Sequence, residues 1–386
     1  MTEVLRELGP QDREQAWSLG RLAFGGDPAE AAQPPPAGSR AWGVLDGDRL
    51  LAKASLRTYD QWWGGRAVPM AGVAGVAVHP LARGRGLATR LVRSLLGPMR
   101  SVGPISVLFP TAPGIYRPLG WELVGSLDET VLPTSALRDA GEPGQVVVRQ
   151  AEHTDVPALA ALWRAHGRGT DGLLTRVGSS FPRGAVHVLS HDVVALAERD
   201  GRPVGYLAYD RGRGYGPRSQ LSVGELVGSD QAASSALLRS LGAWDAVAGT
   251  VLWRGPVEEV GLLVKATLPP PERSQRWMLR VTDAPGAIAA RGWPAQLRLE
   301  AAFTLVDPDV PGHEGPWQLS VADGVGRLER THPGPPRLPR LHVRGLALLW
   351  SGVAGTGVLQ RTGLLEHDVP GLDLLGGRTP CLLDYF

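Results

Sequence analysis

The stretch VAVHPLARGRGLATRL, residues 76–91, most constrains what this chain can fold into. Its apolar first part ends at Pro80, and proline stops a strand. Beyond it, Leu87, Leu91 and Leu95 follow the four-residue spacing of a helix. The residues RGRG lie between these two parts. The stretch therefore predicts a strand that passes into a helix through a loop rich in arginine and glycine.

A junction of this kind suits a ligand that carries phosphate. The first turn of a helix presents unpaired backbone N–H groups and the positive end of the helix dipole. Glycines let the backbone approach a ligand, and arginines add charge-assisted bonds to a pyrophosphate. The loop lacks the Gly-Lys-Ser/Thr of a Walker A motif and the GxGxxG frame of a dinucleotide fingerprint. An arginine-rich surface turn remains an alternative.

Helices and strands are expected to alternate around this junction. Asp46–Gly47 and Gly64–Gly65 are typical hairpin turns, and the loop after the first helix is rich in proline, which removes backbone donors. The expected elements are a helix at 11–24, a loop at 25–39, three strands within 42–78 and a short strand at 104–109.

The chain then repeats its opening plan and changes character once more. VVVRQAEHTDVPALAALWRAH, from residue 146, has the same order of strand, polar turn and helix as VLRELGPQDREQAWSLGRLAF, from residue 4. From about residue 285, strands are expected around one or two helices. The sequence therefore predicts a mixed α+β fold with three domains, at residues 1–145, 146–284 and 285–386.

Composition argues against several classes of protein. A net charge of +2 gives no general reason to expect a nucleic-acid partner. The longest apolar run, 67–78, is too short and too rich in glycine to span a bilayer, and the N-terminus does not resemble a signal peptide. Scattered histidines and a single cysteine, Cys381, predict no metal site and no internal disulfide. We therefore expect a cytoplasmic protein with neither a membrane nor a nucleic-acid partner.

The stretch VAVHPLARGRGLA resembles the pyrophosphate loop of the GNAT acetyltransferases, which has the form V-x-P-x-x-R-x-x-G-x-G/A. In that family the loop holds the diphosphate of acetyl-CoA, and the preceding strand pairs with pantetheine. The resemblance implies acetyl-CoA as co-substrate and the following cofactor-binding residues: Val76, Ala77, Val78, Arg83, Gly84, Arg85, Gly86, Leu87 and Ala88.

A second segment, GIYRPLGWELVG from Gly114, resembles the Eis-type (enhanced intracellular survival) acetyltransferases. The overall plan is similar as well: two tandem GNAT-like domains, a sterol-carrier-protein-like α+β domain and an aromatic last residue. This resemblance implies acetylation of amines on polyamine-like small molecules, typically aminoglycosides, and assembly into a hexamer. The second domain lacks an Arg/Gly loop at the corresponding junction, so we expect it not to bind CoA.

Acetyl transfer to an amine requires a base for the amine and a proton for the leaving thiolate. Tyr116, in a turn after a predicted strand, is the candidate general acid, although it could simply pack that turn. The resemblance implies that the base is the α-carboxylate of Phe386. Such a group, with a reference pKa of about 3.3–3.7, is a weak base unless it is desolvated or relayed through water. A frayed terminus is the alternative, but CLLDYF is apolar nearly to its end, which favours docking.

The amine acceptor requires acids and aromatic faces. Phe24, Asp27, Trp42 and Tyr385 are the candidate substrate-binding residues, and the loop at 25–39 is a candidate lid. Acetylation of protein or peptide lysines is a rival function, which would require an open groove. A non-catalytic module that binds CoA or a lipid in the last domain is another rival.

Overall fold

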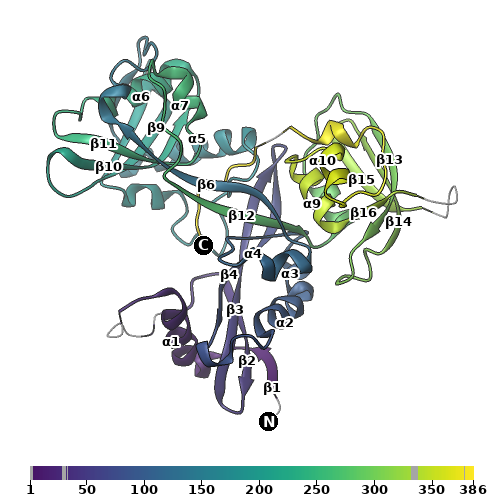
Figure 1. Ribbon diagram of the computed structural model, residues 1–386. Helices are drawn as coiled ribbons and strands as arrows, with labels where there is room; N and C mark the ends of the chain where they lie inside the picture. Colours follow the sequence, from purple (N-terminus) through teal and green to yellow (C-terminus); the bar gives the residue numbers. More distant parts are fainter. Residues whose placement is uncertain (1–2, 28–31, 33, 332–337, 378) are drawn as a thin grey trace.

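Three units follow one another along the chain, and they form three lobes of the structure (Figure 1). The structure is a computed structural model that describes residues 3–27, 32, 34–331, 338–377 and 379–386. The predicted mixed α+β fold is confirmed. Across the described ranges, no helix has both the length and the apolar character that crossing a membrane requires.

The first unit has the predicted alternation of helices and strands. Both expected hairpins form, because Gly47, Gly64 and Gly65 adopt φ values of 59°, 56° and 78°, which L side chains rarely tolerate. Its elements are β1 (Glu3–Glu7), α1 (Arg13–Phe24), β2 (Ser39–Asp46), β3 (Arg49–Trp63), β4 (Arg66–Val78), α2 (Leu87–Ser94), α3 (Leu96–Val102), β5 (Ile105–Leu108), α4 (Pro113–Tyr116) and β6 (Glu122–Pro133).

The second unit repeats the first in detail. Arg6 binds Asp12 through two hydrogen bonds of 2.7 and 2.8 Å just before α1, and Arg149 binds Asp155 at 2.7 and 2.9 Å just before α5. The pKa of Asp155 is lowered to about 2, mainly by its hydrogen bond with Arg149. The elements are β7 (Val147–Gln150), α5 (Val156–Gly169), β8 (Val193–Arg199), β9 (Arg202–Arg211), β10 (Gly216–Gly228), α6 (Gln231–Gly242), β11 (Ala248–Arg254), α7 (Glu258–Leu263) and β12 (Arg273–Val281).

The two units share strands. Within the described residues, one 12-stranded sheet runs in the order β1-β2-β3-β4-β5-β12-β6-β11-β10-β9-β8-β7. Strand β12 lies in the range predicted for the second domain, yet it pairs with β5 and β6. Strand β6 in turn pairs with β11 of the second unit through residues 129–133. The sheet therefore continues without a break from one unit to the other (Figure 1).

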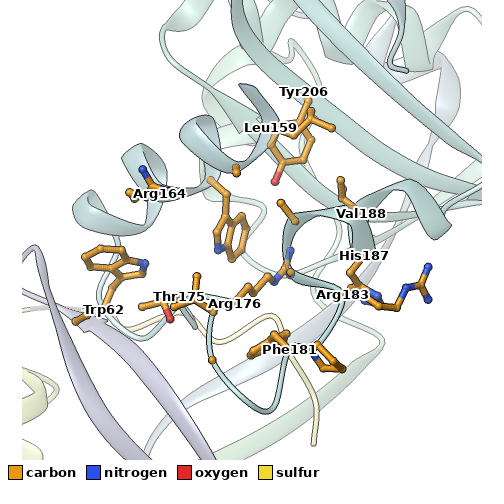
Figure 2. Close-up of a pocket in the computed structure, with 18 residues that line it drawn as sticks. Trp62, Leu159, Arg164, Thr175, Arg176, Phe181, Arg183, His187, Val188 and Tyr206 are labelled. Atoms are coloured by element: carbon orange, nitrogen blue, oxygen red, sulfur yellow. The ribbon is translucent and has the colours of Figure 1, made fainter. Parts of the chain in front are cut away.

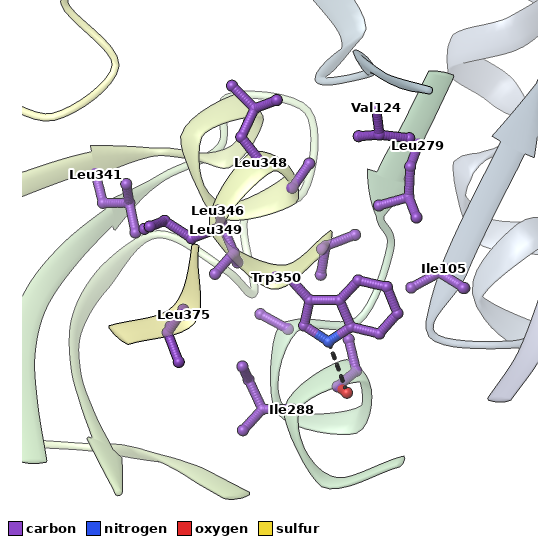
Figure 3. Close-up of a cluster of buried hydrophobic side chains, with 14 of the residues drawn as sticks. Ile105, Val124, Leu279, Ile288, Leu341, Leu346, Leu348, Leu349, Trp350 and Leu375 are labelled. Atoms are coloured by element: carbon purple, nitrogen blue, oxygen red, sulfur yellow. Dashed lines mark hydrogen bonds between the residues drawn. The ribbon is translucent and has the colours of Figure 1, made fainter. Parts of the chain in front are cut away.

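The third unit packs against this shared part of the sheet. Figure 3 shows Trp350 beside Ile105, Val124 and Leu279 of strands β5, β6 and β12, and its indole donates a 2.9 Å hydrogen bond to the carbonyl of Ala287. The elements of this unit are α8 (Ala284–Ala290), β13 (Leu299–Val306), β14 (Gly315–Ala322), β15 (Val325–Arg330), β16 (Arg340–His342), α9 (Val343–Ser351) and α10 (Thr356–Arg361).

A buried ion pair adds to this contact. Arg280 of β12 and Asp307, which follows β13, lie 2.9 Å apart, and neither side chain is exposed. The same carboxylate meets Nδ1 of His313 at 2.8 Å. Burial opposes the charged form of Asp307, but its hydrogen bond with His313 and the charge of Arg280 lower its pKa overall. The third unit is thus tied to β12 by charge as well as by apolar packing.

Candidate active site

Strands β4 and β5 separate in the middle of the first unit. They pair in parallel only where Met70–Gly72 face Ile105–Val107; β5 then ends at Leu108, whereas β4 continues to Val78. A bulge accompanies this separation, because β4 places the extra residue Gly75, with a φ of 58°, opposite β3. Bulges beside active sites commonly redirect the backbone. The edge of β4 at Val76–Val78 has no strand partner among the described residues on the side of β5, and it borders the opening.

The arginine- and glycine-rich loop lies at the far end of β4. His79 ends the strand, and its Nδ1 accepts a 3.3 Å hydrogen bond from the backbone N–H of Leu81. Gly84 and Gly86 have φ values of 77° and 71°, and a Cβ at either position would meet no atom within 4 Å. Within the described part of the chain, no side chain caps the first turn of α2. This open, uncapped helix start fits a diphosphate.

Some of the predicted cofactor-binding side chains already have partners within the protein. Arg85 and Arg90 both pair with Glu3 of β1, the second at 2.6 Å, so a phosphate would compete with that carboxylate for Arg85. Arg83 is exposed and has no ion pair within the described residues. Leu87 is buried in the core, so only its backbone faces a ligand at this turn.

The C-terminal tail is docked rather than frayed. It leaves the third unit, passes the second and ends beside the first (Figure 1). The backbone N–H of Cys381 donates a 2.8 Å hydrogen bond to the carbonyl of Asp171. The ring of Phe386 lies 4.8 Å from that of Tyr59 and 5.9 Å from that of Phe109, measured between centroids. The last residue therefore lies at the opening between β4 and β5.

A buried ionic cluster holds the tail to the second unit. Arg176 pairs with Asp384 at 3.1 Å and with Glu225 at 2.5 Å, and its guanidinium lies 3.9 Å from the centre of the Trp163 ring. Burial raises the pKa of Asp384, and the charge of Arg176 opposes that shift. The cluster fixes the chain two residues before Phe386.

Tyr116 ends α4, close to the end of β5. Its side chain is buried in the same apolar cluster as Val73 and Leu108, and its ring lies 6.3 Å from that of Trp121. Its hydroxyl has no hydrogen-bond partner among the described residues. Burial raises the pKa of Tyr116 to about 12, so the phenol keeps its proton at neutral pH. No ring contact joins it to Phe386 within the described part of the chain.

The predicted acceptor residues do not meet in one cavity. Phe24 lines a cavity of about 230 Å³ with Trp17, Arg21 and Lys53. Tyr385 lines another cavity, beside Phe386. Trp42 is buried in the core of the first unit, and Asp27 is exposed just after α1 and lines neither cavity. Of the predicted lid at 25–39, residues 28–31 and 33 lie outside the described residues.

The cavity beside Phe386 has a volume of about 240 Å³. Leu174 and Asp384 also line it, and its remaining walls come from residues that the sequence did not single out: Arg57 and Tyr59 of β3, and the segment 180–187. Arg57 and Tyr59 are two residues apart, a spacing that places both side chains on the same face of a strand. Which face meets the tail depends on contacts between distant parts of the chain, and the local pattern contains no information about these.

A larger cavity, of about 560 Å³, shares part of the same segment. Figure 2 shows Phe181, Arg183 and His187 along the segment, with Trp62 and Tyr206 on other walls. Phe181, Arg183 and His187 line both cavities. None of the cavities described here is lined by residues 285–383.

The ring of Phe386 leaves no room for a side chain on β4 at Gly72. A Cβ there would lie 2.7 Å from Cε2 of Phe386 and 2.8 Å from Cε2 of Tyr59. We expect Gly72→Ala to displace both rings and to lower kcat/KM about tenfold, since small misplacements at a reacting centre are costly. Steady-state kinetics would measure this.

Gly97→Ala is the matched control, because a Cβ at that helical position meets nothing within 4 Å and its φ is not in the left-handed region. It should leave kcat/KM unchanged and slightly raise the melting temperature. Normal kinetics for Gly72→Ala would mean that activity does not depend on where the Phe386 ring lies.

Comparisons with known proteins agree with this architecture. The chain matches the acetyltransferase (GNAT) domain family at residues 4–124 and, through a second such family, at 172–281, and it matches the sterol carrier protein domain at 284–378. An uncharacterized N-acetyltransferase of Streptomyces avermitilis is 29% identical over 351 residues, which is 84% of each chain.

Two solved structures extend over the whole chain. The GCN5-related N-acetyltransferase from Kribbella flavida is 32% identical, with a TM-score of 0.85, and the match covers 100% of this chain and 98% of that one. Eis1 from Mycobacterium abscessus has the same fold, with a TM-score of 0.74 at 20% identity and 100% of both chains covered. With two GNAT domains and a sterol carrier protein domain in Eis-like order, this chain is an N-acetyltransferase that belongs to the GCN5-related N-acetyltransferase family.

Proposed function

We propose that the enzyme transfers an acetyl group from acetyl-CoA to a primary amine of a small molecule, at the opening between β4 and β5. The observation that carries the proposal is the docked C-terminus. Phe386 lies against Gly72 in the middle of β4, the last residue of that strand that pairs with β5, and the uncapped start of α2 lies beyond the C-terminal end of the same strand. Phe386 and the start of α2 thus lie along one strand, β4, at the middle of the strand and after its C-terminal end.

The residues of the first unit fit the co-substrate. The backbone of Gly84–Ala88 and the guanidinium of Arg83 would hold the diphosphate, and Arg85 would join them when it leaves Glu3. The free edge of Val76–Val78 would align the pantetheine arm. Bound acetyl-CoA supplies the activated acyl group as a thioester. The second unit is proposed not to take part, because the side chain of Asp230 already accepts the N–H of Ala233 at the start of α6.

Two groups would handle the protons. The α-carboxylate of Phe386 accepts a proton from the attacking amine, directly or through water. The hydroxyl of Tyr116 gives its proton to the departing thiolate, and its pKa of about 12 keeps that proton available at neutral pH. One proton is taken up and one is given, so the net products are an amide and a free thiol.

The family resemblance supports a more specific proposal for the acceptor and for the assembly. The acceptors would be polyamines such as aminoglycosides, bound among Phe24, Asp27, Trp42 and Tyr385, and the enzyme would assemble as a hexamer. The buried position of Trp42 favours a packing role for that residue. The small cavity beside Phe386 favours a small acceptor over a lysine presented on a protein surface.

The test is release of thiol from acetyl-CoA by the full-length protein with neamine, phenethylamine, phenylalanine and a lysine-containing peptide, with the acetylated product identified by mass. We expect thiol release that matches the acetylated small molecule. Acetylation of the peptide alone would favour the protein-directed rival. Tight acetyl-CoA binding without acetylation of any amine would support the non-catalytic module.

A further inference from the structure

Arg57 is a half-buried arginine in the cavity beside Phe386, and it lacks a charged partner. It lies on β3 directly opposite Gly72 of β4. Its Nη1 donates a long, 3.4 Å hydrogen bond to the hydroxyl of Tyr59, and its Nε is buried with no hydrogen-bond partner among the described residues. Within the described residues it forms no ion pair. A half-buried guanidinium with a buried, unpartnered Nε is stabilised when an anion pairs with it.

The remaining charges of the cavity do not supply that anion. Asp384 lines the cavity but is paired with Arg176. The terminal carboxylate of Phe386 makes no ion pair with Arg57 in the described part of the structure. Arg183 and His187 line the same cavity and add basic groups. The cavity therefore has spare positive charge, which disfavours a polycation and favours a ligand with an acidic group.

The rest of the lining is aromatic. The ring of Tyr59 lies 4.8 Å from that of Phe386 and 5.6 Å from that of Phe181, measured between centroids. Together these rings offer apolar faces beside the guanidinium of Arg57. At about 240 Å³, the cavity suits a molecule smaller than a typical drug.

We propose that the acceptor is a small amine with an anionic group on an apolar body, and that Arg57 binds this anionic group. The inference rests on the proposed function for the transfer to an amine, and it replaces the polyamine acceptor that the family resemblance favours with an anionic one. Arg57 then acts as a residue that determines specificity. It holds the acidic end of the acceptor while the amine faces the terminal carboxylate of Phe386. As in the proposed transfer, the carboxylate of Phe386 takes one proton from the amine and Tyr116 gives one to the thiolate.

Binding can be tested without turnover. The probes are 3-phenylpropanoate and 3-phenylpropan-1-ol, which share an apolar body and differ in charge, and calorimetry on the full-length enzyme measures their affinities. We expect the acid to bind at least tenfold more tightly, and Arg57→Gln to remove this preference. Arg164→Gln is the matched control, because Arg164 is an exposed arginine that lines only the larger cavity (Figure 2). It should preserve the preference.

Steady-state turnover is the second test of the proposal. Phenylalanine should have at least a tenfold higher kcat/KM than phenethylamine, which lacks only the carboxylate, and it should also exceed neamine. The ratio of phenylalanine to phenethylamine should fall to about one in Arg57→Gln and should persist in Arg164→Gln. Melting temperatures of both variants would confirm that they fold.

The outcomes separate the two proposals. Acetylation of phenethylamine or neamine at least as fast as phenylalanine, with equal binding of the two probes, would overturn the anionic acceptor and leave amine acetylation intact. Binding of the acid through Arg57 without acetylation of any amine would overturn the proposed function and leave the anion site intact. Tighter binding of the acid that survives Arg57→Gln would overturn the role of Arg57.

Discussion

Adding one glycine after Phe386 should lower kcat by at least about 100-fold, the lower range for losing a general base. The extension keeps the Phe386 ring, which packs on Tyr59, but it moves the terminal carboxylate along the chain by about 3.5 Å. The carboxylate then no longer reaches the amine at the opening between β4 and β5. Steady-state kinetics with a saturating acceptor would measure the loss.

Phe386→Ala is the informative partner of this variant. It keeps a carboxylate at the same chain position and removes the ring, so it should retain more activity than the glycine extension. Deletion of Phe386 removes both features and should be at least as inactive as the extension. Equal turnover by the deletion variant and the full-length enzyme would eliminate the terminal carboxylate as the base, while the assignment as an acetyltransferase would stand.

Tyr116→Phe should lower kcat by about 100-fold or more, because the departing thiolate loses its proton donor. The substitution should not disturb the fold, because the hydroxyl has no hydrogen-bond partner among the described residues and its removal leaves no other group unsatisfied. The melting temperature should therefore change little. A loss of kcat below threefold would contradict the assignment of Tyr116 as the acid.

The dependence of kcat on pH provides a further check on Tyr116. Burial raises its pKa to about 12, above the ordinary value of about 10, so the proton is lost only at higher pH than in an exposed tyrosine. The wild-type enzyme should therefore show no loss of kcat from this group between pH 8 and 10. A fall to half the plateau value at pH 10 would indicate an ordinary phenol and would contradict the buried environment.

Local patterns in the sequence predicted local structure well. The helix at 11–24, the hairpins at Asp46–Gly47 and Gly64–Gly65, and the junction after Pro80 all follow from spacing and from turn residues. Such features depend on a few neighbouring residues, so the sequence contains enough information to predict them. Gly84 and Gly86 have positive φ values, which were not predicted from the sequence, because these glycines were explained by the close approach of a ligand.

Contacts between distant segments were not predictable in this way. Nothing near residues 273–281 indicates that β12 pairs with β5, because a strand does not specify its partner locally. Trp42 is a candidate for the acceptor site, and the structure buries it in the core of the first unit, since an aromatic side chain is equally suited to a core and to a binding face. Arg57 was missed because its significance arises only when the tail lies beside β3.

The exchange of strands has a consequence for synthesis on the ribosome. The first unit lacks β12 between β5 and β6 until residue 281 has been made, so its sheet has an unfilled gap while residues 134–281 are added. At 5–20 residues per second, that interval is on the order of ten seconds. During this time the nascent chain exposes strand edges that can pair with other chains. The first unit therefore cannot complete its sheet before the second unit has been synthesised. We expect the nascent chain to bind chaperones until residue 281 has emerged from the ribosome.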